Sequence, residues 1–280
     1  MKVIIIGSGV MGSGIAIESI RAGYSTLLYD INAEALTKAE SYIHQQLDKA
    51  QSIGKISEES RLNSLKLLQF SHQFEDLQAD FILEAIVEKL PVKQDLFAKL
   101  EAQNSENCIF ATNTSSIPIT QIARGLKHPE RLVGVHFFNP AHIMKLVEII
   151  SGAATDESVA QKAYDWAVKL GKTAVYAKDA PGFIVNRVAR HFYVESLKAL
   201  EEQVGDFEQM DRLMRATSFK MGPFELMDLI GVETNYSVTQ SMFEQFQYDS
   251  KFRPSRIQKQ KVDAGFHGRK TKKGFYSYEG

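Results

Sequence analysis

Cysteine is almost absent from this sequence of 280 residues, which contains a single one, Cys108. One cysteine cannot form an internal disulfide, so a disulfide framework is excluded and a reducing compartment such as the cytoplasm is expected. Cys108 precedes the apolar residues 109–111 in a strand-like run, where a buried thiol is a more frequent role than a nucleophile. The sequence therefore predicts a cytoplasmic protein that is stabilised by its core.

Long apolar runs and an excess of either charge are also missing. No segment approaches the roughly 20 apolar residues that span a bilayer, and the run at residues 3–6 is too short for a secretion signal. The 33 basic and 34 acidic residues nearly balance, which excludes a global field that attracts nucleic acid or anionic membranes. The basic run at residues 269–273 is short and is typical of a solvated tail. We expect a soluble, unexported protein with no nucleic-acid or membrane partner.

Patterns of metal ligands are lacking as well. The seven histidines are scattered, and none forms an H-E-x-x-H motif or lies near paired cysteines. We therefore expect no metal site.

What the sequence does contain is an alternation of strand-like and helix-like segments up to about residue 182. Continuous apolar runs rich in β-branched residues are typical of strands that are buried on both faces of a parallel sheet. Strands are predicted at residues 3–6, 25–29, 79–84, 108–112, 132–137, 144–150 and 173–176. Between them the spacing predicts helices at 11–22, 91–102 and 156–170, and a polar helical pair over 32–66 that breaks near Gly54. This alternation predicts a doubly wound, Rossmann-type α/β sheet.

The pattern changes after residue 182. From Ile184 onward apolar residues such as Val185, Val188 and Leu197 keep helical spacing, with no convincing strand before the last residues. A long helix is expected near 185–200, with shorter helices at 213–216 and 224–229. We therefore predict two domains, an α/β domain over residues 1–182 and an all-helical domain over residues 183–280.

A glycine-rich turn directly follows the first predicted strand. Gly7, Gly9 and Gly12 form a G-x-G-x-x-G motif that opens a predicted helix, and Asp30 closes the next strand. These glycines allow, in order, a tight turn, close approach of the backbone to a pyrophosphate and close packing of the helix on the sheet. Asp30 can accept hydrogen bonds from ribose hydroxyls and repels a 2′-phosphate, so NAD is predicted rather than NADP. The alternatives are simple turn glycines and an aspartate that caps the following helix.

Longer motifs follow one another along the rest of the chain. They are residues 7–14 (GSGVMGSG), 84–88 (EAIVE), 112–116 (TNTSS), 134–140 (GVHFFNP), 144–148 (MKLVE), 179–187 (DAPGFIVNR), 221–228 (MGPFELMD) and 273–276 (KGFY). In this order they resemble the 3-hydroxyacyl-CoA dehydrogenase family, over nearly the whole chain. The resemblance implies an oxidoreductase of fatty-acid metabolism that uses NAD to interconvert an (S)-3-hydroxyacyl-CoA and a 3-oxoacyl-CoA. It also implies a homodimer that forms through the helical domain.

The same resemblance assigns four catalytic positions. It implies that His136, at the end of a predicted strand, takes the hydroxyl proton as the hydride leaves, and that Glu148 orients the imidazole and stabilises its charged form. It further implies that Ser115 and Asn186 hydrogen-bond the oxygen atoms of the substrate. A turn serine and a helix-capping asparagine are the structural alternatives for the last two.

Other positions stay open. The resemblance implies that Glu88 and Lys93 lie near the nicotinamide ribose, although a solvated helix face would also explain both. Lys49 and Lys55, in the helical pair, are candidates for contact with coenzyme A phosphates, and neither is favoured. His142 stands where the family often has proline, which leaves the shape of this loop and the acyl-chain preference open.

Two other functions compete with the acyl-CoA dehydrogenase. A protein with this fold can oxidise a free hydroxy acid, or it can bind NAD without catalysis. The presence of His136, Glu148, Ser115 and Asn186 argues against the non-catalytic protein. The residues do not separate the thioester from the free acid, because the coenzyme A contacts fall where the sequence is least informative.

Overall fold

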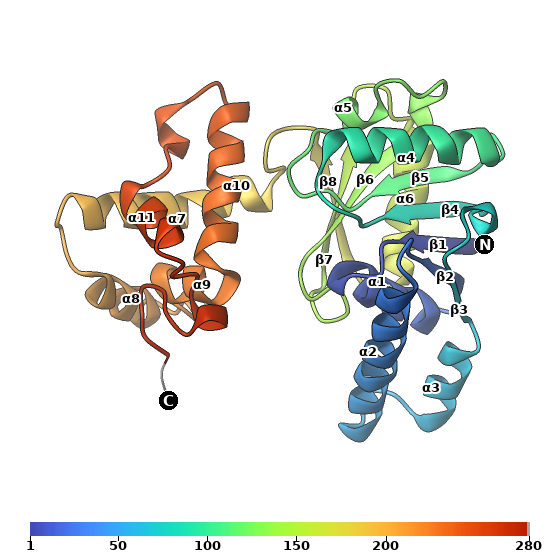
Figure 1. Ribbon diagram of the computed structural model, residues 1–280, viewed down its shortest axis with the longest axis horizontal. Coiled ribbons are helices and arrows are strands. Elements are labelled where there is room, and N and C mark those ends of the chain that lie inside the picture. The colour runs from blue at the N-terminus through green and yellow to red at the C-terminus, as the bar shows by residue number, and fades with distance from the viewer. Residues whose placement is uncertain (279–280) are drawn as a thin grey trace. The chain divides into compact units, whose positions relative to one another are not determined.

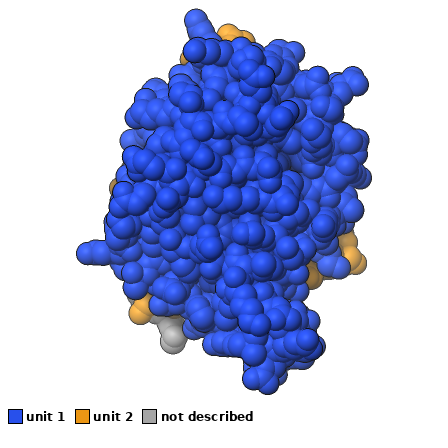
Figure 2. Space-filling view, turned by 90° about the vertical axis from the view of Figure 1, so that its right-hand side faces the viewer, with its two compact units in different colours: residues 1–180 blue, residues 181–280 orange. Residues whose placement is uncertain are grey.

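The computed structural model describes residues 1–278 and divides the chain into two compact units, Met1–Ala180 and Pro181–Gly280 (Figure 1). Figure 2 draws them in blue and orange and shows one face of the first unit. Among the described residues, no helix has the length and apolar character needed to cross a membrane.

An eight-stranded sheet organises the first unit, in the order β3-β2-β1-β4-β5-β6-β7-β8. All neighbouring strands are parallel except β6 and β7, which are antiparallel. The strands are β1 (Lys2–Ile6), β2 (Ser25–Tyr29), β3 (Leu68–Ser71), β4 (Phe81–Glu84), β5 (Ile109–Thr112), β6 (Leu132–Phe137), β7 (Leu146–Ser151) and β8 (Thr173–Lys178). The predicted doubly wound sheet is confirmed, and the strand order reverses between β1 and β4.

Helices connect these strands, as the alternation predicts. They are α1 (Val10–Arg21), α2 (Ala33–Ser52), α3 (Glu58–Leu65), α4 (Leu90–Gln103), α5 (Ile119–Ala123) and α6 (Glu157–Lys169), with short 3₁₀ turns at Phe74–Asp76 and Pro129–Arg131. The core of the unit lies where the apolar faces of α1, α2 and α6 meet the buried strands. The single tryptophan, Trp166 on α6, is buried in this core against Phe81 and Phe137.

Two elements of this unit are not predicted by the sequence, β3 and α5. The strand β3 has four residues and lies at the edge of the sheet, with only β2 beside it, so it needs little of the apolar pattern of a central strand. The helix α5 has five residues, too few to show a helical period. Strands β4 and β7 begin about two residues later than predicted, at Phe81 and Leu146.

The second unit is helical, as predicted. Its helices are α7 (Val185–Glu201), α8 (Phe207–Ala216), α9 (Pro223–Ile230), α10 (Val232–Gln245) and α11 (Arg256–Asp263), with 3₁₀ turns at Ser250–Phe252 and Arg269–Thr271. Helix α8 begins well before the predicted residue 213, because Asp206 and Gln209 form a capping box at its start. A cluster of buried residues forms the core of the unit: Tyr193, Leu197, Phe224, Met227, Val232 and Phe275.

Candidate active site

The glycine-rich turn lies between β1 and α1, where the strand order of the sheet reverses. Gly7 has a φ of +100°, and a Cβ on Gly12 would lie 1.7 Å from the carbonyl oxygen of Gly7, so neither position accepts a side chain. A Cβ on Gly9, by contrast, would meet nothing within 4 Å. Gly9 is also the N-cap of α1 and has no side-chain cap. Open space in front of uncapped helix N–H groups fits a phosphate of a dinucleotide.

Asp30 follows β2 and faces this turn. Its Oδ2 accepts hydrogen bonds from the backbone N–H of Ser8 at 2.8 Å and from the Ser8 hydroxyl at 2.9 Å. The cap of α2 is supplied by Asn32 instead, whose side chain accepts from the backbone N–H groups of residues 34 and 35. Asp30 Oδ1 also accepts from the backbone N–H of Asn32 at 3.0 Å, so Asp30 joins the turn around Ser8 to the residue before α2 without capping that helix itself.

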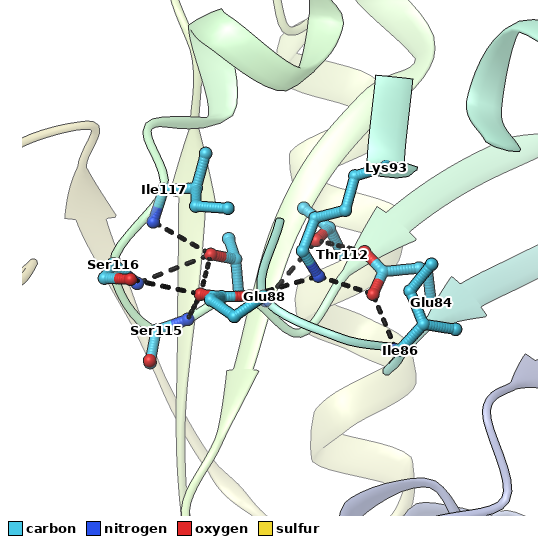
Figure 3. Close-up of polar contacts among 9 residues, drawn as sticks. Glu84, Ile86, Glu88, Lys93, Thr112, Ser115, Ser116 and Ile117 are labelled. Atoms are coloured by element: carbon cyan, nitrogen blue, oxygen red, sulfur yellow. Dashed lines mark hydrogen bonds and ion pairs between the residues drawn. The ribbon is translucent and has the colours of Figure 1, made fainter. Parts of the chain in front are cut away.

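A charged network connects the carboxyl ends of β4 and β5 with the start of α4 (Figure 3). The ammonium of Lys93 lies 2.5 Å from Glu84 Oε1 and 3.1 Å from Glu88 Oε2, and its side chain is only 1% exposed. Glu84, fully buried, also accepts hydrogen bonds from the Thr112 hydroxyl at 2.7 Å and from the backbone N–H of Ile86 at 2.8 Å. Lys93 is thus not part of a solvated helix face.

Glu88 connects this network to the loop that contains Ser115. It accepts hydrogen bonds from the Thr114 hydroxyl at 2.5 Å, from the Ser115 backbone N–H at 3.0 Å and from the Ser116 hydroxyl at 3.2 Å (Figure 3). Burial by itself would raise the pKa of Glu88, but the charge of Lys93 and these hydrogen bonds outweigh burial and lower it. Glu88 is therefore ionised at neutral pH and holds the Ser115 loop in place.

His136 and Glu148 face each other across the antiparallel pair of β6 and β7. The register places them directly opposite one another, and His136 Nδ1 lies 2.8 Å from Glu148 Oε2. Both side chains are buried. A carboxylate can only accept here, so Nδ1 carries the hydrogen and Nε2 is the basic nitrogen. The end of β6 is also tied to the loop after β5, because the Phe137 backbone N–H donates to Asn113 Oδ1 at 2.8 Å.

The structure thus brings five of the predicted site residues to the carboxyl ends of β4, β5 and β6, where ligands collect in open α/β sheets: Glu88, Lys93, Ser115, His136 and its partner Glu148. Asn186 lies in the first turn of α7, in the second unit. Sequence reasoning assigned no role to Glu84 or Thr112, although both lie within the quoted motifs. A polar side chain at the end of an otherwise apolar buried strand is the signal that identifies them.

A basic pocket of about 370 Å³ lies elsewhere in the first unit, between α1, the end of α2, the loop at 142–145 and residues 170–172. Both open lysine candidates, Lys49 and Lys55, line it, as does His142. The pocket is also lined by the cations Arg21, Lys145 and Lys172, and the one carboxylate among its lining residues is that of Glu18. Lys172 forms an ion pair with Glu18 at 2.8 Å, so the remaining cations leave the pocket positive. Such a pocket favours an anionic group.

Comparison with known families matches both units. Residues 2–180 match the family model described as 3-hydroxyacyl-CoA dehydrogenase, NAD binding domain, and residues 182–278 match the model of the C-terminal domain of the same family.

Similar proteins cover the whole chain. A 3-hydroxyadipyl-CoA dehydrogenase of Escherichia coli is 45% identical over 99% of the chain, which spans 58% of that relative's length. A 3-hydroxybutyryl-CoA dehydrogenase of Bradyrhizobium diazoefficiens is 38% identical, with 100% of this chain and 96% of that protein covered. Among solved structures, an (S)-3-hydroxybutyryl-CoA dehydrogenase from Ralstonia eutropha superposes with a TM-score of 0.96 at 33% identity, covering 100% and 99% of the two chains.

Proposed function

The chain belongs to the 3-hydroxyacyl-CoA dehydrogenase family, and we propose that it catalyses the reversible oxidation of an (S)-3-hydroxyacyl-CoA to the 3-oxoacyl-CoA. The predicted class of enzyme, a 3-hydroxyacyl-CoA dehydrogenase that depends on NAD, is confirmed by this membership. When bound, NAD supplies the hydride acceptor. The roles of individual residues are our proposal.

His136 acts as the general base, and the observation that carries this assignment is its 2.8 Å contact with the buried Glu148. Nε2 takes the proton of the 3-hydroxyl group while the C–H bond at C3 breaks and its two electrons leave as hydride. Glu148 holds the ring in orientation and compensates the positive charge that His136 gains. In the reverse direction the same nitrogen returns the proton to the oxygen at C3.

Cofactor contacts follow from the turn and the charged network. Gly7, Gly9 and Gly12 leave room for the pyrophosphate at the start of α1, and Asp30 accepts hydrogen bonds from the adenosine ribose. The carboxylate of Asp30 disfavours a 2′-phosphate, which supports NAD over NADP. Glu88 and Lys93 lie near the nicotinamide ribose.

Ser115 and Asn186 are the proposed substrate contacts. Ser115 hydrogen-bonds the oxygen at C3, and Asn186 donates to that oxygen or to the thioester carbonyl, where it stabilises developing charge. The coenzyme A phosphates occupy the basic pocket. Lys49 and Lys55 both line this pocket, so both belong to the same phosphate site. The relatives' names specify two kinds of acyl chain, an uncharged 3-hydroxybutyryl chain and a 3-hydroxyadipyl chain that ends in a carboxylate.

Residues 1–182 form the NAD-binding domain, and residues 183–280 form the helical domain for substrate binding and dimerisation. Exposed apolar side chains of the helical domain, among them Val188, Leu213 and Phe219, support a homodimer. The single cysteine, which is buried, supports a cytoplasmic location. Burial raises the pKa of Cys108 to about 12, so it does not act as a thiolate nucleophile.

The first test is the loss of NADH absorbance when acetoacetyl-CoA is added to the purified protein, with free acetoacetate and NADPH as controls. Oxidation that requires both the thioester and NADH is expected. Oxidation with free acetoacetate alone would favour a hydroxy-acid dehydrogenase. No oxidation in a protein that still binds NADH would favour a non-catalytic one.

A further inference from the structure

The basic pocket of the first unit contains one group whose charge can change near neutral pH, the imidazole of His142. The other cations that line the pocket are permanent at this pH: Arg21, Lys49, Lys55, Lys145 and Lys172. The one lining carboxylate, that of Glu18, forms ion pairs with Arg21 at 2.7 Å and with Lys172 at 2.8 Å. For the other three lysines, no ion pair is found within residues 1–278. The pocket therefore lacks negative charge of its own and favours an anionic ligand.

The loop that carries His142 is held on both sides of this residue. The ammonium of Lys172 donates to the Ala141 carbonyl oxygen at 2.7 Å and to the Met144 carbonyl oxygen at 3.1 Å. Helix α1 lies against the same loop at Gly14, where a Cβ would lie 3.1 Å from Ala141 Cβ and 3.4 Å from His142 Nδ1. The imidazole therefore has a fixed place in the wall of the pocket before a ligand binds, which lowers the entropic cost of binding.

The two ring nitrogens of His142 have different surroundings. Nδ1 is enclosed and has no hydrogen-bond partner, whereas Nε2 is not enclosed. Within residues 1–278 the ring forms no hydrogen bond, and its aromatic neighbour is Tyr42 of α2, edge to face at a centroid distance of 6.1 Å. Because Nδ1 lies against α1, Nε2 is the nitrogen that a ligand in the pocket can reach. An imidazole nitrogen that carries a hydrogen can donate it to a phosphate oxygen.

Charged groups face this imidazole from several elements. Burial lowers the pKa of His142, while Glu18 of α1 acts in the opposite direction. The cations that lower it further lie on α1, near the end of α2 and just after α6: Arg21, Lys49 and Lys172. The ring is therefore mostly neutral at pH 7 in the ligand-free protein. A bound phosphate raises the pKa again, because its negative charge favours the protonated ring and offsets repulsion by the cations.

We propose that His142 binds a phosphate of coenzyme A through Nε2 and takes up a proton from the solvent as the phosphate binds. This inference rests on the proposed function and adds a regulation of the phosphate site by pH. The complex holds more protons than the free protein, so the affinity for coenzyme A thioesters rises as the pH falls through the pKa of His142 in the complex. The gain is complete below the lowered pKa of the free protein. Family membership does not supply this inference, since the family often has proline at this position.

The test measures the binding of adenosine 3′,5′-bisphosphate, the adenosine end of coenzyme A, by isothermal titration calorimetry from about pH 8 to about pH 5.5. NADH is present throughout, so that the dinucleotide site is filled. His142→Gln keeps an uncharged N–H donor but does not titrate, and His142→Ala removes the donor as well. His72→Gln replaces an exposed histidine outside the pocket and is the matched control. Ratios of Kd between variant and wild type remove the titration of the phosphate itself, whose second pKa is about 6.

We expect the affinity of the wild-type protein, relative to both His142 variants, to rise by about threefold to tenfold over this pH range, the value of one partly exposed charge-assisted hydrogen bond. His72→Gln should follow the wild type at every pH. Titrations in two buffers of different ionisation enthalpy should show that the wild-type protein takes up more protons than His142→Gln, by at most about one per probe molecule. The KM for acetoacetyl-CoA should show the same difference, and the KM for acetoacetyl-N-acetylcysteamine, which lacks the nucleotide, should not.

The outcomes separate this inference from the function on which it rests. Affinity ratios that do not change with pH, or equal proton uptake by wild type and His142→Gln, refute the role of His142 even if acetoacetyl-CoA is oxidised. Oxidation of acetoacetyl-CoA by a protein that does not bind the bisphosphate also refutes it, because the pocket is then not the nucleotide site. If no thioester is oxidised, the proposed function fails, while bisphosphate binding with the expected proton uptake still supports His142 as a phosphate ligand.

Discussion

Replacing Glu84 by glutamine should destabilise the first unit by about 3 kcal/mol. At an effective dielectric constant of about 20, the gross attraction of Lys93 to Glu84 at 2.5 Å is about 7 kcal/mol, and its attraction to Glu88 at 3.1 Å is about 5 kcal/mol. Desolvation of the buried groups offsets much of both. Removing one partner of a buried pair typically costs about 3–5 kcal/mol. The lower end applies to Glu84→Gln because Glu88 still compensates Lys93.

The coupling free energy between Glu84 and Lys93 tests the ion pair more specifically than the loss of stability in either single variant. Lys93→Met should cost about 4 kcal/mol, since it leaves the fully buried carboxylate of Glu84 without a cation. The double variant should also cost about 4 kcal/mol rather than the sum of both, a coupling of about 3 kcal/mol. Lys99→Met, on the same helix, breaks only the exposed pair with Asp95 and should cost less than about 0.5 kcal/mol.

Urea unfolding followed by tryptophan fluorescence measures these differences. The sequence has one tryptophan, and Trp166 is buried in the core of the first unit, so its emission reports the unfolding of that unit. This avoids treating two compact units as one two-state transition. The coupling is refuted if the losses of stability in the two single variants add up in the double variant, or if Glu84→Gln lowers the free energy of unfolding by less than about 1 kcal/mol. Either result would show that Glu84 and Lys93 are not coupled through their charges.

Three further predictions concern the remaining site residues. His136→Ala should lower kcat by about 10²–10⁴-fold, the usual contribution of a general base, while the affinity for NADH in fluorescence titrations stays near wild type; near-normal turnover would refute the role of His136. Asp30→Ala should raise the KM for NAD and reduce the preference over NADP in paired assays, and an unchanged preference would leave Asp30 a purely structural residue. Glu88 has a lowered pKa in the folded protein, so its stabilising contribution is complete above its ordinary pKa and is lost as the pH falls through the folded value. Urea unfolding followed by Trp166 fluorescence should therefore show that the free energy of unfolding falls below about pH 4.5. This fall should be smaller in Glu88→Gln than in the wild-type protein.

The sequence predicts those elements whose conformation is determined by residues close together in the chain. The first strand is a run of four β-branched residues. The turn after it has no room for a Cβ at Gly7 or Gly12, and the G-x-G-x-x-G motif records this requirement in the sequence. Edge strand β3 has no such local cause, because it is held by one neighbour and shows no clear alternation. The contact between His136 and Glu148 also depends on register, which the eleven residues between them do not reveal.

Helix α7 shows most clearly where periodicity misleads. Val188 belongs to the apolar spacing that predicts the helix, yet it is 69% exposed. The buried side of α7 consists of Arg190, Tyr193 and Leu197, so a charged residue occupies a core position. Hydrophobic spacing cannot find a buried cation, because it scores every charge as solvent-facing. The position that the pattern misses is held by hydrogen bonds, because Arg190 donates to the Asn235 carbonyl oxygen and to the Thr239 hydroxyl of α10.

The proposed catalytic residues of the first unit are held by the sheet and by one charged network. The register of β6 and β7 sets the proposed pair of His136 and Glu148, and Glu88, which is paired with Lys93, holds the Ser115 loop. These positions cannot shift independently, because each is tied to neighbouring strands.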